Sequence, residues 1–156
     1  MKVFLLCVLL LGGCAAARLS LPPLDMQPLH AEFGLRFSHA GMSIPLHGAV
    51  QITKHDGRLG IIFPHGRTLG VCRYLEDGME CVPASEETPG ARVMLRQIGL
   101  AVYRILPSLA QESSRDIVES DFAVRWEKTG SGRSAEYRDL SSQVTVDMHF
   151  TEIVRP

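Results

Sequence analysis

Apolar side chains occupy every second position in three separate segments of this chain, residues 33–37, 122–126 and 144–150. Successive side chains of a β-strand point to opposite faces, so this alternation predicts strands that bury one face and expose the other. Such a strand is stable only when its apolar face is covered by another layer. The pattern therefore favours an antiparallel sheet with a covering element.

Shorter apolar runs predict further strands. Residues 50–52, 59–63, 69–74 and 79–82 each carry such a run. Segments rich in glycine, proline and aspartate separate them, and residues 41–45 predict a turn. These runs have the spacing of consecutive antiparallel strands.

The period of the apolar residues changes between residues 91 and 106. The apolar positions of this segment are Met94, Leu95, Ile98, Val102 and Ile105. Their three- and four-residue steps predict a helix over residues 91–106, ended by Pro107. We expect an α+β fold with about seven to nine antiparallel strands and this helix inserted after the fifth. The sheet would be curved, or a half-open β-barrel, packed on the helix in a single domain over residues 31–156.

The amino terminus has the organisation of an export signal. Met1 and Lys2 precede nine apolar residues, Val3 to Leu11, which are too few to span a bilayer. The next residues are Gly12, Gly13 and Cys14. The alternative interpretation is an ordinary secretory signal that is cleaved a few residues after Cys14, at Ala16 or Ala17.

The sequence from Leu11 to Cys14 resembles the lipobox of bacterial lipoproteins. That resemblance implies that residues 1–13 are a signal peptide and that Cys14 is lipidated with diacylglycerol and with a fatty acid such as palmitate. It also implies a membrane-attached tether over residues 14–30, which holds three prolines after Leu21. Alanine rather than aspartate follows the cysteine, so we expect the outer membrane, on the side facing the periplasm.

Two cysteines remain after such processing, Cys72 and Cys81. Asp77-Gly78 between them is a hairpin signal, and a four-residue loop over 75–78, with Gly78 left-handed, places the cysteines opposite each other. Export provides an oxidising compartment, so we predict a structural disulfide. A redox pair is the alternative, but the spacing differs from Cys-X-X-Cys.

Composition and motifs exclude several classes of function. The formal net charge is −1 and no basic run is present, which argues against nucleic acid as a partner. The sequence has no motif of a hydrolase, a phosphate-binding loop or a metalloprotease. Six histidines are spaced as loop residues rather than as metal ligands; they are His30, His39, His47, His55, His65 and His149. We expect no enzyme activity, no cofactor and no metal.

Residues 93–107, from Val93 to Pro107, resemble a helix of a family of small bacterial lipoproteins. Members of that family are often encoded beside aryl-polyene lipid biosynthesis genes. The match extends loosely to the closing strands and covers most of residues 31–153. A wider resemblance is to the LolA/LolB lipoprotein carriers. Their half-open barrel, lidded by helices, implies an apolar cavity for acyl chains.

The resemblance leads to the hypothesis that this chain binds or transfers a lipid or lipid-linked molecule, with the helix as a movable lid. The residues expected to line the pocket are Phe33, Leu35, Phe37, Ile61, Phe63, Met94, Ile98, Val102, Val124 and Trp126. The same residues would equally fill a closed core. The alternative function is a scaffolding lipoprotein of an envelope complex, with a filled core, an exposed sheet edge and an unidentified protein partner.

Overall fold

The computed structural model describes residues 19–21, 27–85, 90–109, 114–130 and 132–155. These residues form ten strands and one helix, an α+β fold. The elements are β1 (Leu19–Ser20), β2 (Leu29–His39), β3 (Met42–Ile52), β4 (Gly57–Ile62), β5 (Thr68–Leu75), β6 (Gly78–Pro83), α1 (Ala91–Leu109), β7 (Arg115–Val118), β8 (Phe122–Thr129), β9 (Gly132–Asp139) and β10 (Val144–Val154).

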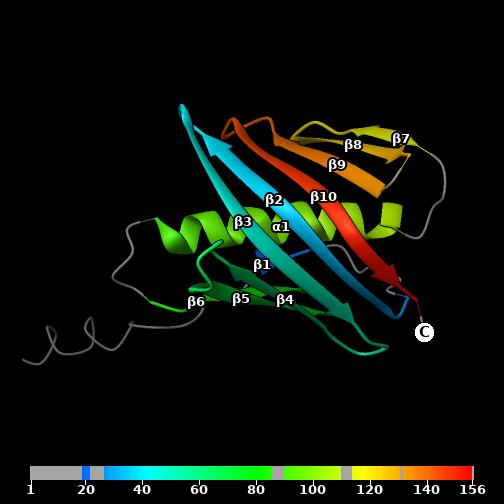
Figure 1. Cartoon of the computed structure of the whole chain (residues 1–156), viewed down its shortest axis with the longest axis horizontal. Helices are drawn as coiled ribbons and strands as arrows, with labels where there is room; N and C mark the ends of the chain where they lie inside the picture. Colours follow the sequence, from blue (N-terminus) through cyan, green and yellow to red (C-terminus); the bar gives the residue numbers. More distant parts are fainter. Residues whose placement is uncertain (1–18, 22–26, 86–89, 110–113, 131, 156) are drawn as a thin grey trace, which may run out of the picture.

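All ten strands belong to one antiparallel sheet, in the order β1-β6-β5-β4-β3-β2-β10-β9-β8-β7. Most neighbours are consecutive hairpin strands. The centre of the sheet, however, is the long pairing of β2 with β10, which joins the two ends of the domain. The sheet curves around α1, so that β4–β6 and β7–β9 lie on either side of the helix (Figure 1). The strands β1 and β7 form the two edges, and the sheet is open.

The sheet contains more residues than the sequence analysis assigned to it. Residues 19–20, within the expected tether, pair with β6, and β2 begins at Leu29. The turn expected over residues 41–45 is wrong: only Ala40 and Gly41 turn, with φ of 50° and 81°. Pro45 lies in β3, where only β2 pairs with it, because the pairing with β4 starts at His47. Proline is tolerated at such a local edge.

The helix begins at the expected residue but continues past Pro107 to Leu109, so the predicted end is wrong. Both Ser108 and Leu109 are fully buried. The side chains of Arg133 and Arg155 donate hydrogen bonds to the Leu109 carbonyl oxygen, one of the carbonyls that a helix end leaves without an intrahelical partner. Burial and capping of this last turn compensate for the N–H that proline lacks.

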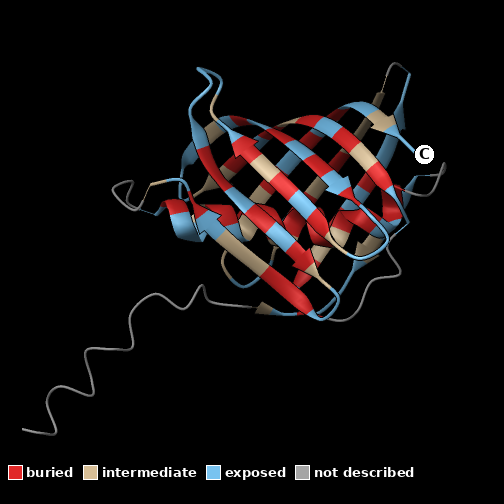
Figure 2. Cartoon of the chain, turned by 90° about the horizontal axis from the view of Figure 1, so that it is seen from below, coloured by how far each residue is buried: buried red, intermediate tan, exposed pale blue. Residues whose placement is uncertain are grey.

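One apolar core lies between the sheet and α1. Along the strands, buried and exposed residues alternate, as the sequence pattern predicts (Figure 2). Three aromatic rings, from β2, β10 and β8, meet in the core: the Phe150 ring lies 5.1 Å from Phe33 and 5.6 Å from Trp126, between centroids. The concave face of the sheet is therefore filled by side chains from both layers.

Candidate functional site

The ten residues expected to line a lipid pocket are brought together, but as core. Eight are buried in the apolar cluster, each at most 6% exposed: Phe33, Leu35, Phe37, Ile61, Ile98, Val102, Val124 and Trp126. The other two, Phe63 and Met94, are partly buried against its rim. Trp126 also lines an open cavity beside β7. In this structure the set packs together rather than enclosing a space.

The cysteines are paired across the β5–β6 hairpin. Cys72 is directly opposite Cys81, and their Sγ atoms are 1.98 Å apart in a disulfide. The expected loop is too long: the strands continue to Leu75 and restart at Gly78, so only Glu76 and Asp77 connect them. Gly78 is therefore a strand residue, without the left-handed conformation that the sequence analysis gave it.

The helix packs directly on this disulfide at Gly99. A β-carbon at Gly99 would lie 2.9 Å from Sγ of Cys72 and 3.1 Å from Sγ of Cys81. The Tyr74 hydroxyl, also on β5, donates a 2.8 Å hydrogen bond to the Gly99 carbonyl oxygen. Because it is completely buried, the pKa of Tyr74 is raised well above its usual value. The glycine thus sets the distance between α1 and the hairpin.

A second buried phenol lies on the other half of the sheet. The pKa of Tyr137 is raised to about 12, chiefly by burial; in decreasing order of effect, the Asp139 carboxylate raises it, the Arg104 guanidinium lowers it and the Asp121 carboxylate raises it. The Arg104 guanidinium lies 4.2 Å above the ring of Phe122, as a cation–π contact. The Arg104 side chain from α1 therefore covers this edge of the core.

A cavity with polar lining residues lies where α1 ends, beside the start of β9 and the end of β10. Its volume is about 430 Å³, and its lining residues are Gly132, Arg133, Phe150, Thr151, Glu152, Ile153 and Arg155. The guanidinium of Arg133 is 3.5 Å from the Leu109 carbonyl oxygen, to which Arg155 also donates. Sequence reasoning missed this cavity. The sequence does contain one indication of it, a cationic residue on the inward face of a strand. Arg133 is two residues before the buried Ala135 and four before the buried Tyr137, so it lies on the same face of β9.

The histidines are exposed or half-buried, but most are not in loops as predicted. His30, His39, His47 and His149 lie within β2, β3 and β10, in part because the strands are longer than expected. Within the part of the chain that the structure describes, no three side chains of histidine, cysteine, aspartate or glutamate gather as a metal site.

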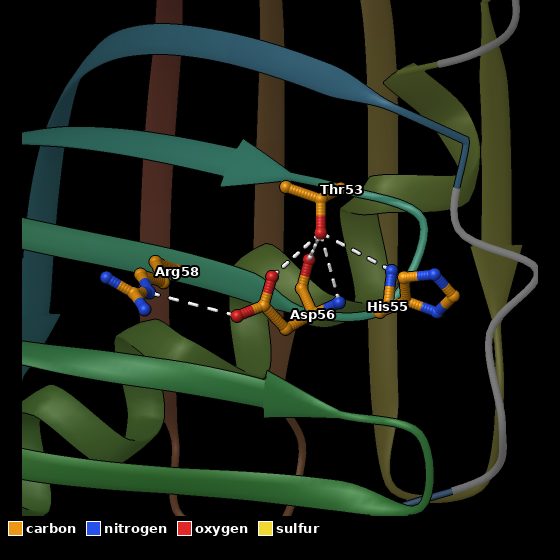
Figure 3. Close-up of polar contacts among 4 residues, drawn as sticks. All are labelled: Thr53, His55, Asp56 and Arg58. Atoms are coloured by element: carbon orange, nitrogen blue, oxygen red, sulfur yellow. Dashed lines mark hydrogen bonds and ion pairs between the residues drawn. The ribbon is translucent and has the colours of Figure 1, made fainter.

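The hairpin between β3 and β4 holds a group of polar contacts that resembles a catalytic arrangement in composition only (Figure 3). The Thr53 hydroxyl lies 2.7 Å from Oδ1 of Asp56, and Nε of Arg58 is 3.9 Å from the other carboxylate oxygen. His55 takes part through its backbone N–H, which donates to the Thr53 hydroxyl at 3.3 Å. These contacts close a turn, and the imidazole has no part in them.

Comparison with known proteins shows no family model that matches and no curated protein that matches. Among solved structures, the chain is similar to the crystal structure of an SsgA-like sporulation-specific cell division protein from Thermobifida fusca YX-ER1. The two are 10% identical, with a TM-score of 0.33, over 81% of this chain and 72% of the other. The resemblance to the small lipoprotein family stays a prediction.

Among the residues described, no helix has both the length and the apolar character that a membrane span requires. Cys14, the expected site of lipid attachment, and residues 1–13, the expected signal peptide, lie outside the described residues. Both stay predictions from the sequence.

Proposed function

We propose that this chain is a lipid-anchored protein of the outer membrane that binds or transfers a lipid or lipid-linked molecule in the periplasm, without catalysis. The observation that supports this best is the open, curved sheet whose concave face is covered by a single helix. The LolA/LolB carriers, which the sequence resembles, likewise cover a half-open barrel with helices. The anchor at Cys14 would keep the domain at the surface from which it takes its ligand.

Transfer requires α1 to move, because its apolar face is packed in the core. The side chains of Ile98 and Val102 are at most 1% exposed, so an acyl chain reaches the sheet only where they withdraw. A bound acyl chain would then replace their contacts, with a gain of about 25 cal/mol for each Å² of apolar surface removed from water. The packed state is thus the ligand-free form of the proposed carrier.

A scaffolding role in an envelope complex is the second candidate, and two observations favour it. The core between α1 and the sheet is filled, and β7 is an edge strand of four residues whose Val118 is 75% exposed. An unpaired edge can accept a strand from another protein. In that case the protein would form a complex through β7 and would extract no lipid.

Transfer of a fluorescent phospholipid from donor to acceptor vesicles separates the two functions. The carrier accelerates transfer; an unchanged transfer rate would contradict lipid transport and favour the scaffold. Ile98→Glu places a carboxylate on the buried face of α1 and should abolish transfer. Val93→Glu makes the same change on its exposed face, where the side chain is 65% exposed, and should leave transfer intact. Circular dichroism of both variants tests whether they fold, and Ile98→Val replaces Ile98→Glu if that variant does not.

A further inference from the structure

We propose that Arg133 and Arg155 bind an oxyanion, the phosphate or carboxylate headgroup of an amphiphile, in the cavity at the end of α1. This inference rests on the proposed function and specifies its ligand class. The cavity has a volume of about 430 Å³ and opens where Phe150 of β10 pairs with Arg133 of β9.

The two arginines have unused hydrogen-bonding capacity. Each guanidinium carries five N–H donors. In the part of the chain described, both use a donor for the same acceptor, the Leu109 carbonyl oxygen, and neither forms an ion pair with a carboxylate. The carbonyl at the end of a helix carries only part of a negative charge, so it cannot neutralise two cations. An oxyanion between them would accept several charge-assisted hydrogen bonds at once.

One acidic group also borders the cavity. Glu152 is exposed and follows the irregularity in the β10–β2 pairing between Phe150 and Glu152. Its carboxylate opposes an incoming anion, but the cavity lining still has two cations and one anion. His149, beside Gly132, lies on the outward face of β10 and is exposed. Because the Glu152 carboxylate repels an anion, removing its charge should strengthen the binding of an anionic ligand and thus tests the sign of the ligand charge.

Two of the residues that line the cavity are apolar. Phe150, 4% exposed, and Ile153 line it, and the Phe150 ring contacts both Phe33 and Trp126 in the core. A headgroup on the arginines would therefore have its chain beside the edge of the core. A ligand with a charged head and an apolar tail fits this arrangement, whereas an inorganic anion would use only the cations.

Calorimetric titration of the full chain in a nonionic detergent tests the site. The probes are decyl phosphate, inorganic phosphate and the uncharged amphiphile decyl maltoside. We expect decyl phosphate to bind more tightly than inorganic phosphate, and decyl maltoside not to bind. Arg133→Gln or Arg155→Gln should weaken binding about tenfold, because a hydrogen bond to a charged group is lost. Glu152→Gln should strengthen binding by removing the repulsion.

Arg73→Gln is the matched control, because it removes the same charge from an exposed site on β5, in the other half of the sheet. It should leave binding unchanged. Arg133→Lys keeps the charge but loses the planar donor pair, and should fall between wild type and Arg133→Gln. Thermal unfolding of every variant shows whether its fold is retained.

The outcomes separate this site from the proposed function. Binding of decyl phosphate that Arg133→Gln and Arg155→Gln leave unchanged would overturn the site, while lipid transfer could still occur. Equal binding of both phosphates would support the oxyanion site and remove the role of the tail. If neither decyl phosphate nor inorganic phosphate binds, the inference is overturned.

Discussion

Replacing Gly99 by alanine should destabilise the oxidised protein, although alanine is the better helix former. The new β-carbon would lie 2.7 Å from Sδ of Met79 and 2.9 Å and 3.1 Å from the sulfurs of Cys72 and Cys81. A methionine side chain is flexible enough to move away. The two cysteine sulfurs are joined across a hairpin and cannot.

Two opposing contributions decide how much Gly99→Ala changes the free energy of unfolding. Alanine gains about 1 kcal/mol over glycine in a helix interior. An extra carbon in a packed core costs about 1–3 kcal/mol. The net change in the oxidised protein is therefore a loss of roughly 0–2 kcal/mol. When Cys72 and Cys81 are both alanine, the sulfurs are gone, and the same replacement of Gly99 should stabilise by about 1 kcal/mol.

The assay is urea denaturation of four proteins: wild type, Gly99→Ala, the double cysteine variant and the triple variant. Removal of the disulfide alone should cost about 2.6 kcal/mol, from the closure entropy of a loop with a sequence separation of 9. The coupling between Gly99 and the disulfide is the quantity of interest. If Gly99→Ala stabilises both backgrounds by the same amount, the close packing of α1 on the disulfide is refuted.

Three further outcomes follow from the sequence and the core. Cys14→Ser should release the protein from membranes, as fractionation would show; unchanged attachment would remove the anchor. Thiol titration of the unfolded, unreduced soluble domain, which lacks Cys7 and Cys14, should detect neither Cys72 nor Cys81, and two reactive thiols would exclude their disulfide. The raised pKa values of Tyr74 and Tyr137, the latter about 12 against an ordinary 10.0, mean that the unfolded state loses its phenol protons first. The free energy of unfolding should thus be unaffected below pH 10 and decrease as the pH rises towards 12, less steeply in Tyr137→Phe. An equal slope in that variant would contradict the burial of Tyr137.

Much of the fold follows from local pattern. The period of two over residues 33–37, 122–126 and 144–150 predicts strands that the structure contains, because one face of each is buried in the apolar core. The apolar face of residues 91–106 predicts the helix for the same reason. Cys72 and Cys81 are opposite each other because the hairpin signal between them is local. Their disulfide follows from that register.

The remainder depends on tertiary context. Pro107 does not end α1, because the burial of Leu109 and the arginines on its carbonyl oxygen stabilise one more half-turn. β1 has two residues and exists only through its pairing with β6, so no periodicity could predict it.

The candidate site was harder to predict than the fold. An apolar residue that lines a cavity and one that fills a core have the same sequence pattern, so the list from Phe33 to Trp126 was correct about burial and could not decide between them. The cavity with Arg133 and Arg155 joins residues that are distant in sequence from the end of α1. Only the pairing of β9 with β10 brings the two arginines to one helix end.

Native mass spectrometry of the full chain, extracted from the membranes of its own cells, tests the proposed function most directly. We predict a population whose mass exceeds that of the acylated chain by one phosphate- or carboxylate-bearing amphiphile, which dissociates on activation. If the spectrum shows only the acylated chain without a bound amphiphile, although the lipids of the extract are present and intact, lipid binding is contradicted.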